Sequence, residues 1–481
     1  MTSYKKEITK GVFWIAIAKY SGFAIQLIIS AILARLISPS AFGTIAIAMV
    51  ILHFLNILAD IGIGPAVVQY KELTAEHLNS LFTLNLYIGI ALSLLLFLFS
   101  SEISRYYADD VLCYVCQIFI IVVIFNSLNV VPNALMRRNK KFKIISLYTL
   151  SFQVLGGSVA VWGAFNGWGV YSLIISPIIA AIGVFCVNYY YYPLRFELHI
   201  NNKAVKTISS FSLFQFAFSF INYFSRNLDK LIIGKHFSMG QLGYYDKSYH
   251  LMLLPVQNIA YIIDPVLHPI LSSLKDDKKE LSNKNIKLVR VISYISFPLG
   301  LILYFCGGEL IKIVYGSKWD AAIPVFQILA LSLPLQIILP TSGTIYQAAG
   351  KTNFMFYNGV INTSVTIIGF FIAAINFKNI NAMAWAWVIT LLINFFISYY
   401  ILYKFALVEK VNLLFRALIP QFINSVTTFL IVTILFRYLE GYNLFFSLFV
   451  KSSFIILITL VMGISIRQYS IKQICKFKLR K

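Results

Sequence analysis

Charged residues are scarce in this 481-residue chain: Asp, Glu, Lys and Arg together make up 12% of it, and only 18 residues are acidic. A water-soluble protein of this size keeps about a quarter of its residues charged. Hydrophobic residues account for 59% of the sequence, and the mean hydropathy is +0.79. Too little polar sequence remains to coat several soluble domains. The composition therefore excludes them, together with a disordered chain and a nucleic-acid-binding domain.

Cysteine and catalytic motifs are also in short supply. The five cysteines are odd in number and give no disulfide framework. Cys113 and Cys116 have the spacing of a redox or metal pair, but they open an apolar helix, and we interpret them as small apolar residues. The sequence has no Walker A motif, no H-E-x-x-H and no nucleophile elbow. It therefore predicts no catalytic residue, no metal site and no cofactor.

Long apolar runs recur along the whole chain, and each is long enough to cross a bilayer as a helix. They are continuous, which favours helices over the ten-residue alternations of a β-barrel. The sequence thus predicts an all-α polytopic membrane protein with about 14 transmembrane helices. Their expected ranges are 11–36, 41–64, 78–100, 111–135, 144–165, 169–192, 209–234, 242–272, 288–306, 321–349, 352–376, 380–404, 415–437 and 444–466.

The Lys and Arg residues between these helices fall mainly on one side. The N-terminus, the links that follow even-numbered helices and the C-terminal tail carry 28 of them, and the opposite links carry 7. Cytoplasmic loops of membrane proteins hold the excess of Lys and Arg. The pattern predicts that both termini are cytoplasmic, and it accounts for the net charge of +22 without a nucleic-acid partner.

A comparison of the chain with itself indicates an internal repeat at a shift of 200 residues. Arg35, Ser38, Phe42 and Gly43 correspond to Lys235, Ser238, Leu242 and Gly243. We interpret this as a duplication of helices 1–6 as helices 7–12, in the same orientation. The predicted domains are an N-lobe (1–200), a C-lobe (201–406) and a C-terminal part with helices 13 and 14 and a basic tail (407–481).

Two such lobes would flank a central cleft, and their rocking would give the alternating access of a transporter. Two of the predicted helices also hold several prolines, which remove a backbone donor and kink a helix. These prolines fit either moving helices or static kinks. They are Pro255, Pro265 and Pro269 in the eighth helix and Pro324, Pro334 and Pro340 in the tenth.

Several charged residues fall inside the predicted helices. A charge at a helix centre in the bilayer costs about 2.5–3.5 kcal/mol on insertion scales, so such residues tend to face a wet cavity or a partner. The densest group lies in the seventh helix, where spacings of three and four place the residues on one face. The group comprises Arg226, Asp229 and Lys230. The other charged or titratable residues in the helices are Lys19, His53, Asp60, Asp246, Lys247, Asp264 and Lys451.

We interpret the basic members of this set as the lining of a cavity for an anionic ligand: Arg226, Lys230, Lys19 and Lys247. Asp229 would hold the cations in place, and Asp60 and Asp264 are candidates for helix caps, gate partners or ion coupling. An ion-pair network that merely fixes the seventh and eighth helices together is the alternative. Lys451 is interpreted as a lysine that reaches the interface, and His53 as a packed polar residue.

Several segments resemble the Wzx-type polysaccharide flippases of the bacterial inner membrane, in the branch of colanic acid and other exopolysaccharides. The most specific runs from Arg226-Asn-Leu-Asp-Lys-Leu-Ile-Ile-Gly234 through Leu242-Gly-Tyr-Tyr245 to Leu253-Leu-Pro-Val-Gln-Asn258. The other similar segments are 33–43, 60–69, 134–142 and 314–319. The resemblance covers nearly the whole chain and includes the helix count.

This resemblance implies membership of the multidrug/oligosaccharidyl-lipid/polysaccharide exporter superfamily. It implies an inner-membrane transporter that moves undecaprenyl-diphosphate-linked oligosaccharide from the cytoplasmic to the periplasmic leaflet, with a proton or sodium gradient as a candidate driving force. It also implies contact with membrane lipids and with polymerase or export machinery. On the matching positions it supports Arg226, Asp229 and Lys230 as cavity residues.

Two other functions compete with this one, and a non-transporting scaffold for an export assembly is a third alternative. A cation-coupled exporter of small molecules from the same superfamily would need an acidic cavity, whereas the charges inside the helices are mainly basic. A membrane glycosyltransferase or polymerase that acts on the same lipid-linked sugar would need a long or carboxylate-bearing outer loop. The acidic pair Asp109 and Asp110 lies instead in a short link.

Overall fold

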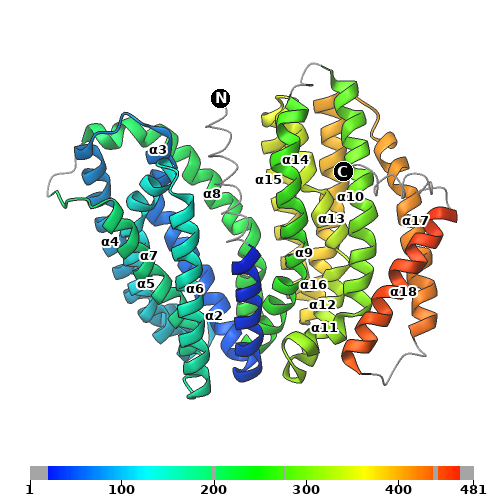
Figure 1. Ribbon diagram of the computed structural model, residues 1–481, viewed down its shortest axis with the longest axis horizontal. Helices are drawn as coiled ribbons and strands as arrows, with labels where there is room; N and C mark the ends of the chain where they lie inside the picture. The colour runs from blue at the N-terminus through cyan, green and yellow to red at the C-terminus, as the bar shows by residue number, and fades with distance from the viewer. Residues whose placement is uncertain (1–19, 198–201, 273, 275–276, 437–442, 466–481) are drawn as a thin grey trace. The chain divides into compact units, whose positions relative to one another are not determined.

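The computed structural model describes residues 20–197, 202–272, 274, 277–436 and 443–465, and all its regular elements in these ranges are helices (Figure 1). Some side chains in the helices at 202–236 and 239–272 also lie outside the description. The all-α fold predicted from the apolar runs is confirmed. The chain divides into two compact units, residues 1–243 and 244–481. The predicted boundaries near residues 200 and 406 stay a prediction.

The first unit is a bundle of long helices joined by short links. Helix α4 packs on α5, α6 packs on α7, and α2 packs on both α5 and α8. Its helices are Tyr20–Leu36, α2 (Pro39–Asp60), α3 (Ile63–Gln69), α4 (Ala75–Tyr107), α5 (Asp110–Arg138), α6 (Phe142–Phe165), α7 (Tyr171–Tyr191) and α8 (Asn202–His236). Helix α9 (Met239–Ser272) begins at the end of this unit and continues into the second.

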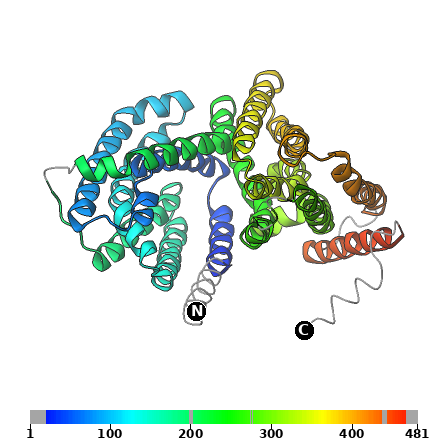
Figure 2. The ribbon, with the colours of Figure 1, turned by 90° about the horizontal axis from the view of Figure 1, so that it is seen from above.

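The second unit contains one span that is broken into short pieces. In that span, Ser317–Ala330 and Leu333–Ala348 meet at an angle of 53°. Helices α17 and α18 lie together at one edge of the unit, where α18 packs on α17, α10 and α11 (Figures 1 and 2). The elements after α9 are α10 (Lys278–Phe305), α11 (Gly307–Val314), η1 (Ser317–Ala322), α12 (Ile323–Ala330), α13 (Leu333–Ile338), α14 (Pro340–Ala348), α15 (Thr352–Phe377), α16 (Ile380–Ile401), η2 (Leu402–Leu407), α17 (Asn412–Leu435) and α18 (Leu444–Ser465).

Ten helices in the described ranges are long and apolar enough to cross a membrane, and the bent pair would be an eleventh. The chain is therefore a multi-pass membrane protein. In the described residues each of the fourteen predicted ranges is mainly helical, the tenth as the broken span, but the first, seventh and eighth are not among these spans. Of those three, α8 and α9 carry most of the charges discussed above. The predicted count of about 14 is therefore not confirmed.

The 200-residue repeat has a clear structural counterpart at the starts of α2 and α9. Helix α2 begins at Pro39 and α9 at Met239, and each is preceded by a serine whose hydroxyl accepts a backbone N–H three residues on. A Cβ on Gly43 would lie 1.8 Å from the Met239 carbonyl oxygen, and one on Gly243 would lie 2.0 Å from the Pro39 carbonyl oxygen. The contact is reciprocal, as a local two-fold relation between repeated turns requires.

A buried ion pair attaches α18 to α11. The Lys451 ammonium lies 2.5 Å from Glu309 Oε1, and the Ser447 hydroxyl donates to the same oxygen at 2.7 Å. The two charged side chains are only 16% and 10% exposed. Lys451 therefore has a protein partner, whereas the sequence suggested a lysine that reaches the interface. The pair fixes the last helix to the rest of the second unit.

Removing one member of this pair should destabilise the protein. We expect Lys451→Met to lower its stability by about 3 kcal/mol, because the Glu309 charge would stay buried without its ammonium partner. The measurement is thermal unfolding in detergent. Lys284→Met is the matched control, since the Lys284–Glu280 pair is 48% and 40% exposed and such pairs contribute about 0–1 kcal/mol. Equal shifts in both variants would contradict the assignment.

The same pair predicts a pH dependence. Burial raises the pKa of the Glu309 carboxyl, but hydrogen bonds from Lys451 and Ser447 outweigh it, so the pKa lies below its ordinary value. A carboxyl with a depressed folded-state pKa stabilises the fold above its ordinary pKa, and this contribution is lost as the pH falls. As the pH falls below 4.5, the ordinary pKa of the carboxyl, the melting temperature should drop more steeply in the wild type than in Glu309→Gln. Parallel curves would refute the contribution of Glu309.

Candidate functional site on helix α8

Aromatic side chains hold the middle of α8 against α2. The ring of Phe54 lies 5.8 Å from that of Phe220, 6.2 Å from that of Tyr223 and 5.3 Å from that of Phe224. The Tyr223 hydroxyl donates a hydrogen bond to the Val50 carbonyl. Such edge-on and offset contacts add about 0.5–1.5 kcal/mol per pair beyond burial. The cluster sets the rotation of α8 and so decides which of its residues face outward.

Both ends of α8 are also attached within the first unit. Near the N-terminus, the Ser212 hydroxyl donates to the Gly62 carbonyl at 3.3 Å, in a turn where Gly62 has a φ of +78° that favours glycine. Near the C-terminus, the Lys235 ammonium donates to the Tyr106 carbonyl at 2.8 Å and lies 4.0 Å from the centre of the Tyr106 ring. The helix is thus a fixed support for its charged residues.

The three predicted charges of α8 differ in burial. Arg226 is exposed, Lys230 is half-buried and Asp229 is 2% exposed. A carboxylate oxygen of Asp229 accepts the backbone N–H of Lys230 at 2.8 Å. This hydrogen bond ties the Asp229 carboxylate to the backbone of its own helix, and its predicted role of holding the cations in place stays a prediction. Arg226 thus presents its guanidinium outward, and Lys230 places its ammonium one turn further along α8. Aromatic side chains of the same helix pack against α2.

His53 of α2 lies one residue before Phe54, whose ring packs on α8. Its side chain is exposed, whereas the sequence suggested a packed polar residue at this position. We define the charged face of α8 as Arg226, Asp229 and Lys230.

The other predicted site residues lie elsewhere or outside the described part of the chain. A carboxylate oxygen of Asp60 accepts the Gly64 N–H at 2.7 Å and so caps the start of α3, which is one of the roles predicted for it. Lys247, in the second unit, is half-buried with its ammonium 5.9 Å from the centre of the Tyr315 ring. Lys19 and the side chain of Asp264 lie outside the described residues. Binding and coupling roles for all four stay predictions.

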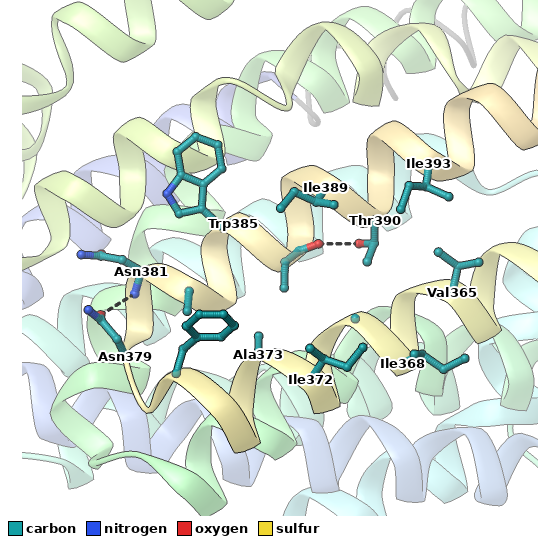
Figure 3. Close-up of a pocket in the computed structure, with 14 residues that line it drawn as sticks. Val365, Ile368, Ile372, Ala373, Asn379, Asn381, Trp385, Ile389, Thr390 and Ile393 are labelled. Carbon is teal, nitrogen blue, oxygen red and sulfur yellow. Dashed lines mark hydrogen bonds between the residues drawn. The ribbon is translucent and has the colours of Figure 1, made fainter.

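Metal binding is not indicated in the described ranges, where no group of three or more His, Cys, Asp or Glu side chains could hold an ion. A cavity of about 720 Å³ lies between α15 and α16, and Figure 3 shows its lining. Ile368, Ile372, Trp385 and Ile389 point into it, and none of its lining residues is charged. Such a lining suits hydrocarbon and offers nothing to neutralise an anion.

Sequence reasoning missed two partners that the fold brings together. One is Glu309, which binds Lys451 from 142 residues away. The other is Asp109, whose carboxylate accepts the Thr44 hydroxyl at 2.5 Å and the Val111 N–H at 3.1 Å, whereas the sequence suggested only a solvated turn. The sequence offered one sign of the first pair. Glu309 is a lone acid directly after an apolar run, and Lys451 is a lysine within the last apolar helix.

The chain has recognisable relatives. Residues 32–324 match a family model described as "Polysaccharide biosynthesis protein". The lipopolysaccharide biosynthesis protein WzxC of Escherichia coli is 26% identical over 410 residues, covering 84% of this chain and 82% of that protein. The teichuronic acid biosynthesis protein TuaB of Bacillus subtilis is 25% identical over 418 residues, covering 86% and 85%.

Among solved structures, the fold is similar to that of the lipid II flippase MurJ in an inward closed conformation. The TM-score is 0.74 at 17% sequence identity, and the match covers 95% of this chain and 99% of MurJ. At this level of identity the likeness establishes a shared fold.

Proposed function

The chain belongs to the polysaccharide biosynthesis protein family, and from this premise we propose that it is a transporter that flips a lipid-linked oligosaccharide across the membrane. The family resemblance read from the sequence motifs is thereby confirmed. The proposed substrate is an undecaprenyl-diphosphate-linked repeat unit of an exopolysaccharide, O-antigen or capsule. The proposed location is the bacterial inner membrane, with both termini in the cytoplasm.

The charged face of α8 is the observation that carries this proposal. A diphosphate can cross a hydrocarbon layer only if its charge is compensated, because an isolated ion there is costly. Arg226 is exposed and can make two parallel hydrogen bonds to phosphate oxygens. Lys230 adds a second cation one turn away, and the buried Asp229 is proposed to keep both oriented.

Transport is proposed to follow alternating access. The head group binds to the cationic face from one leaflet, and a change of conformation then exposes it to the other leaflet while the lipid tail stays in hydrocarbon. No bond is made or broken, so the chain acts as a transporter and not as an enzyme. The mechanism needs no cofactor, and a proton or sodium gradient is the proposed driving force. A polymerase or export assembly is the proposed consumer of the flipped lipid.

A reconstituted flipping assay tests this proposal. Purified protein is placed in liposomes with a fluorescent lipid-linked oligosaccharide, and a membrane-impermeant reagent reports the fraction of head groups in each leaflet. We expect faster exchange than in protein-free liposomes, and a further increase when a proton or sodium gradient is imposed. Exchange equal to that of protein-free liposomes, from correctly folded protein, would refute the proposed function. An unchanged rate with and without either gradient would refute only the coupling.

A further inference from the structure

A second cavity lies at the ends of three helices of the first unit. It has a volume of about 550 Å³ and forms where α4 begins and where α5 and α7 end. The segment that follows α7 closes it. The lining residues that matter for the argument are Ala75, Asn79, Arg138, Tyr191, Tyr192 and Arg195. None of these residues belongs to the charged face of α8, so the cavity is a separate place on the molecule.

One guanidinium in this cavity is held in place and still has a free donor. Arg138 Nη2 donates to the Lys71 carbonyl oxygen at 2.5 Å, which fixes the side chain. Arg138 Nη1 is buried and has no hydrogen-bond partner among the residues that the structure describes. Buried polar groups in proteins are nearly always paired, because an unpaired one costs about 1–3 kcal/mol and more when it is charged.

The electrostatics of the cavity favour an anion. The two charged residues in its lining are Arg138 and Arg195, both cationic. Ala75 is the first residue of the 33-residue helix α4, whose N-terminal end carries partial positive charge. Glu197 lies at the edge, where a carboxylate oxygen accepts the Asn79 amide at 3.1 Å. The exposed charged residues near these helix ends in sequence include the acids Glu72 and Glu76, and the cations are more numerous: Lys71, Arg137, Lys140, Lys141 and Lys143.

The depth of the cavity indicates where the anion comes from. Candidate membrane spans begin at Ala75 and end at Arg138 and Tyr191, so the cavity lies at the ends of three spans. Lipid head groups occupy this level, and tyrosine is enriched there. Tyr191 is 43% exposed and Tyr190 81% exposed beside it. Membrane lipid is therefore the nearest source of phosphate.

We propose that this cavity binds the phosphate of an anionic membrane lipid, with Arg138 as the principal contact and Arg195 at the rim. The two guanidinium groups supply the positive charge, and the start of α4 adds its dipole. The site is independent of substrate transport by α8. It would anchor the ends of α4, α5 and α7 to one leaflet.

Thermal unfolding in detergent with added lipid tests this site without any transport assay. We expect phosphatidylglycerol to raise the melting temperature of the wild type, and zwitterionic phosphatidylcholine or inorganic phosphate at equal concentration to do so much less. In Arg138→Gln the shift with phosphatidylglycerol should fall below half its wild-type size. Arg105→Gln is the control, because Arg105 is an exposed arginine paired with Glu102 outside the cavity.

Arg195→Gln provides a second variant if Arg138→Gln folds poorly. The Arg195 backbone N–H donates to Asn79 at 2.9 Å, and this bond survives the substitution. A smaller shift with phosphatidylglycerol is expected here too. An unchanged shift in both variants would overturn the proposal, as would an equal shift with phosphatidylcholine. A full shift with inorganic phosphate alone would overturn the assignment to a lipid.

Discussion

Replacing Arg226 and Lys230 together by alanine is expected to lower the rate of head-group flipping between tenfold and a hundredfold, while the protein remains folded. A hydrogen bond to a charged group is worth about 1.5–3 kcal/mol. Each 1.4 kcal/mol corresponds to about a factor of ten. The single variants should each lose about tenfold, with the larger loss at the exposed Arg226, which can form two bonds to one phosphate. The measurement is the initial rate in the liposome assay, normalised to inserted protein.

Matched variants separate this effect from a general loss of positive charge. Arg226→Lys keeps the charge but not the planar pair of donors, so we expect it to recover only part of the rate. Arg105→Ala removes an exposed arginine from the end of α4 and should transport like the wild type. Wild-type rates from the Arg226 and Lys230 double variant would disprove a role for this face of α8.

Gly43→Ala and Gly243→Ala should be the most damaging small substitutions in the protein. The added methyl group would lie about 2 Å from a backbone carbonyl oxygen in either case, where no side chain can rotate away. Overpacking commonly costs about 1–3 kcal/mol, and a clash with fixed backbone falls at the upper end. The starts of α2 and α9 would have to separate. We expect a lower melting temperature for both variants and a loss of transport.

Gly359→Ala is the control for this prediction. Gly359 lies within α15 and has open space where its Cβ would be, so alanine should be neutral or slightly stabilising there. The reciprocal geometry also makes a finer prediction: the two damaging variants should resemble each other, because each glycine meets the same feature of the other turn. A wild-type melting temperature in either variant would show that the two turns are not in contact.

The sequence predicted the helices well because its signal is local. A run of about twenty apolar residues must form a helix in lipid, whatever surrounds it. Local sequence also identified the turns at Ser38 and Ser238, because a capping serine and a glycine recur there at a fixed spacing. The count of about 14 spans stays a prediction, since the helices at the first, seventh and eighth predicted ranges are not among the candidate spans found in the described residues.

The candidate site was predictable only in part, for a related reason. Helical spacing grouped Arg226, Asp229 and Lys230, but spacing could not reveal that Asp229 would be buried while Arg226 stays exposed. That difference depends on which face of α8 the ring of Phe54 packs against. Partners on distant segments were likewise out of reach. Lys451 with Glu309 and Arg138 with Lys71 are pairs that only the tertiary fold brings together.

The broken span at α12–α14 bears on how such a chain can move. Side chains form hydrogen bonds at its bend. The Ser332 hydroxyl donates to the Leu329 carbonyl at 2.6 Å, and the Gln336 amide donates to the Ser332 hydroxyl at 2.7 Å. Tyr399 of α16 donates to the Ile338 carbonyl at 3.1 Å. If transport follows the proposed alternating access, we expect a bend held by these bonds to persist through the cycle. The prolines of this span would then act as static kinks, with the flexing in other helices.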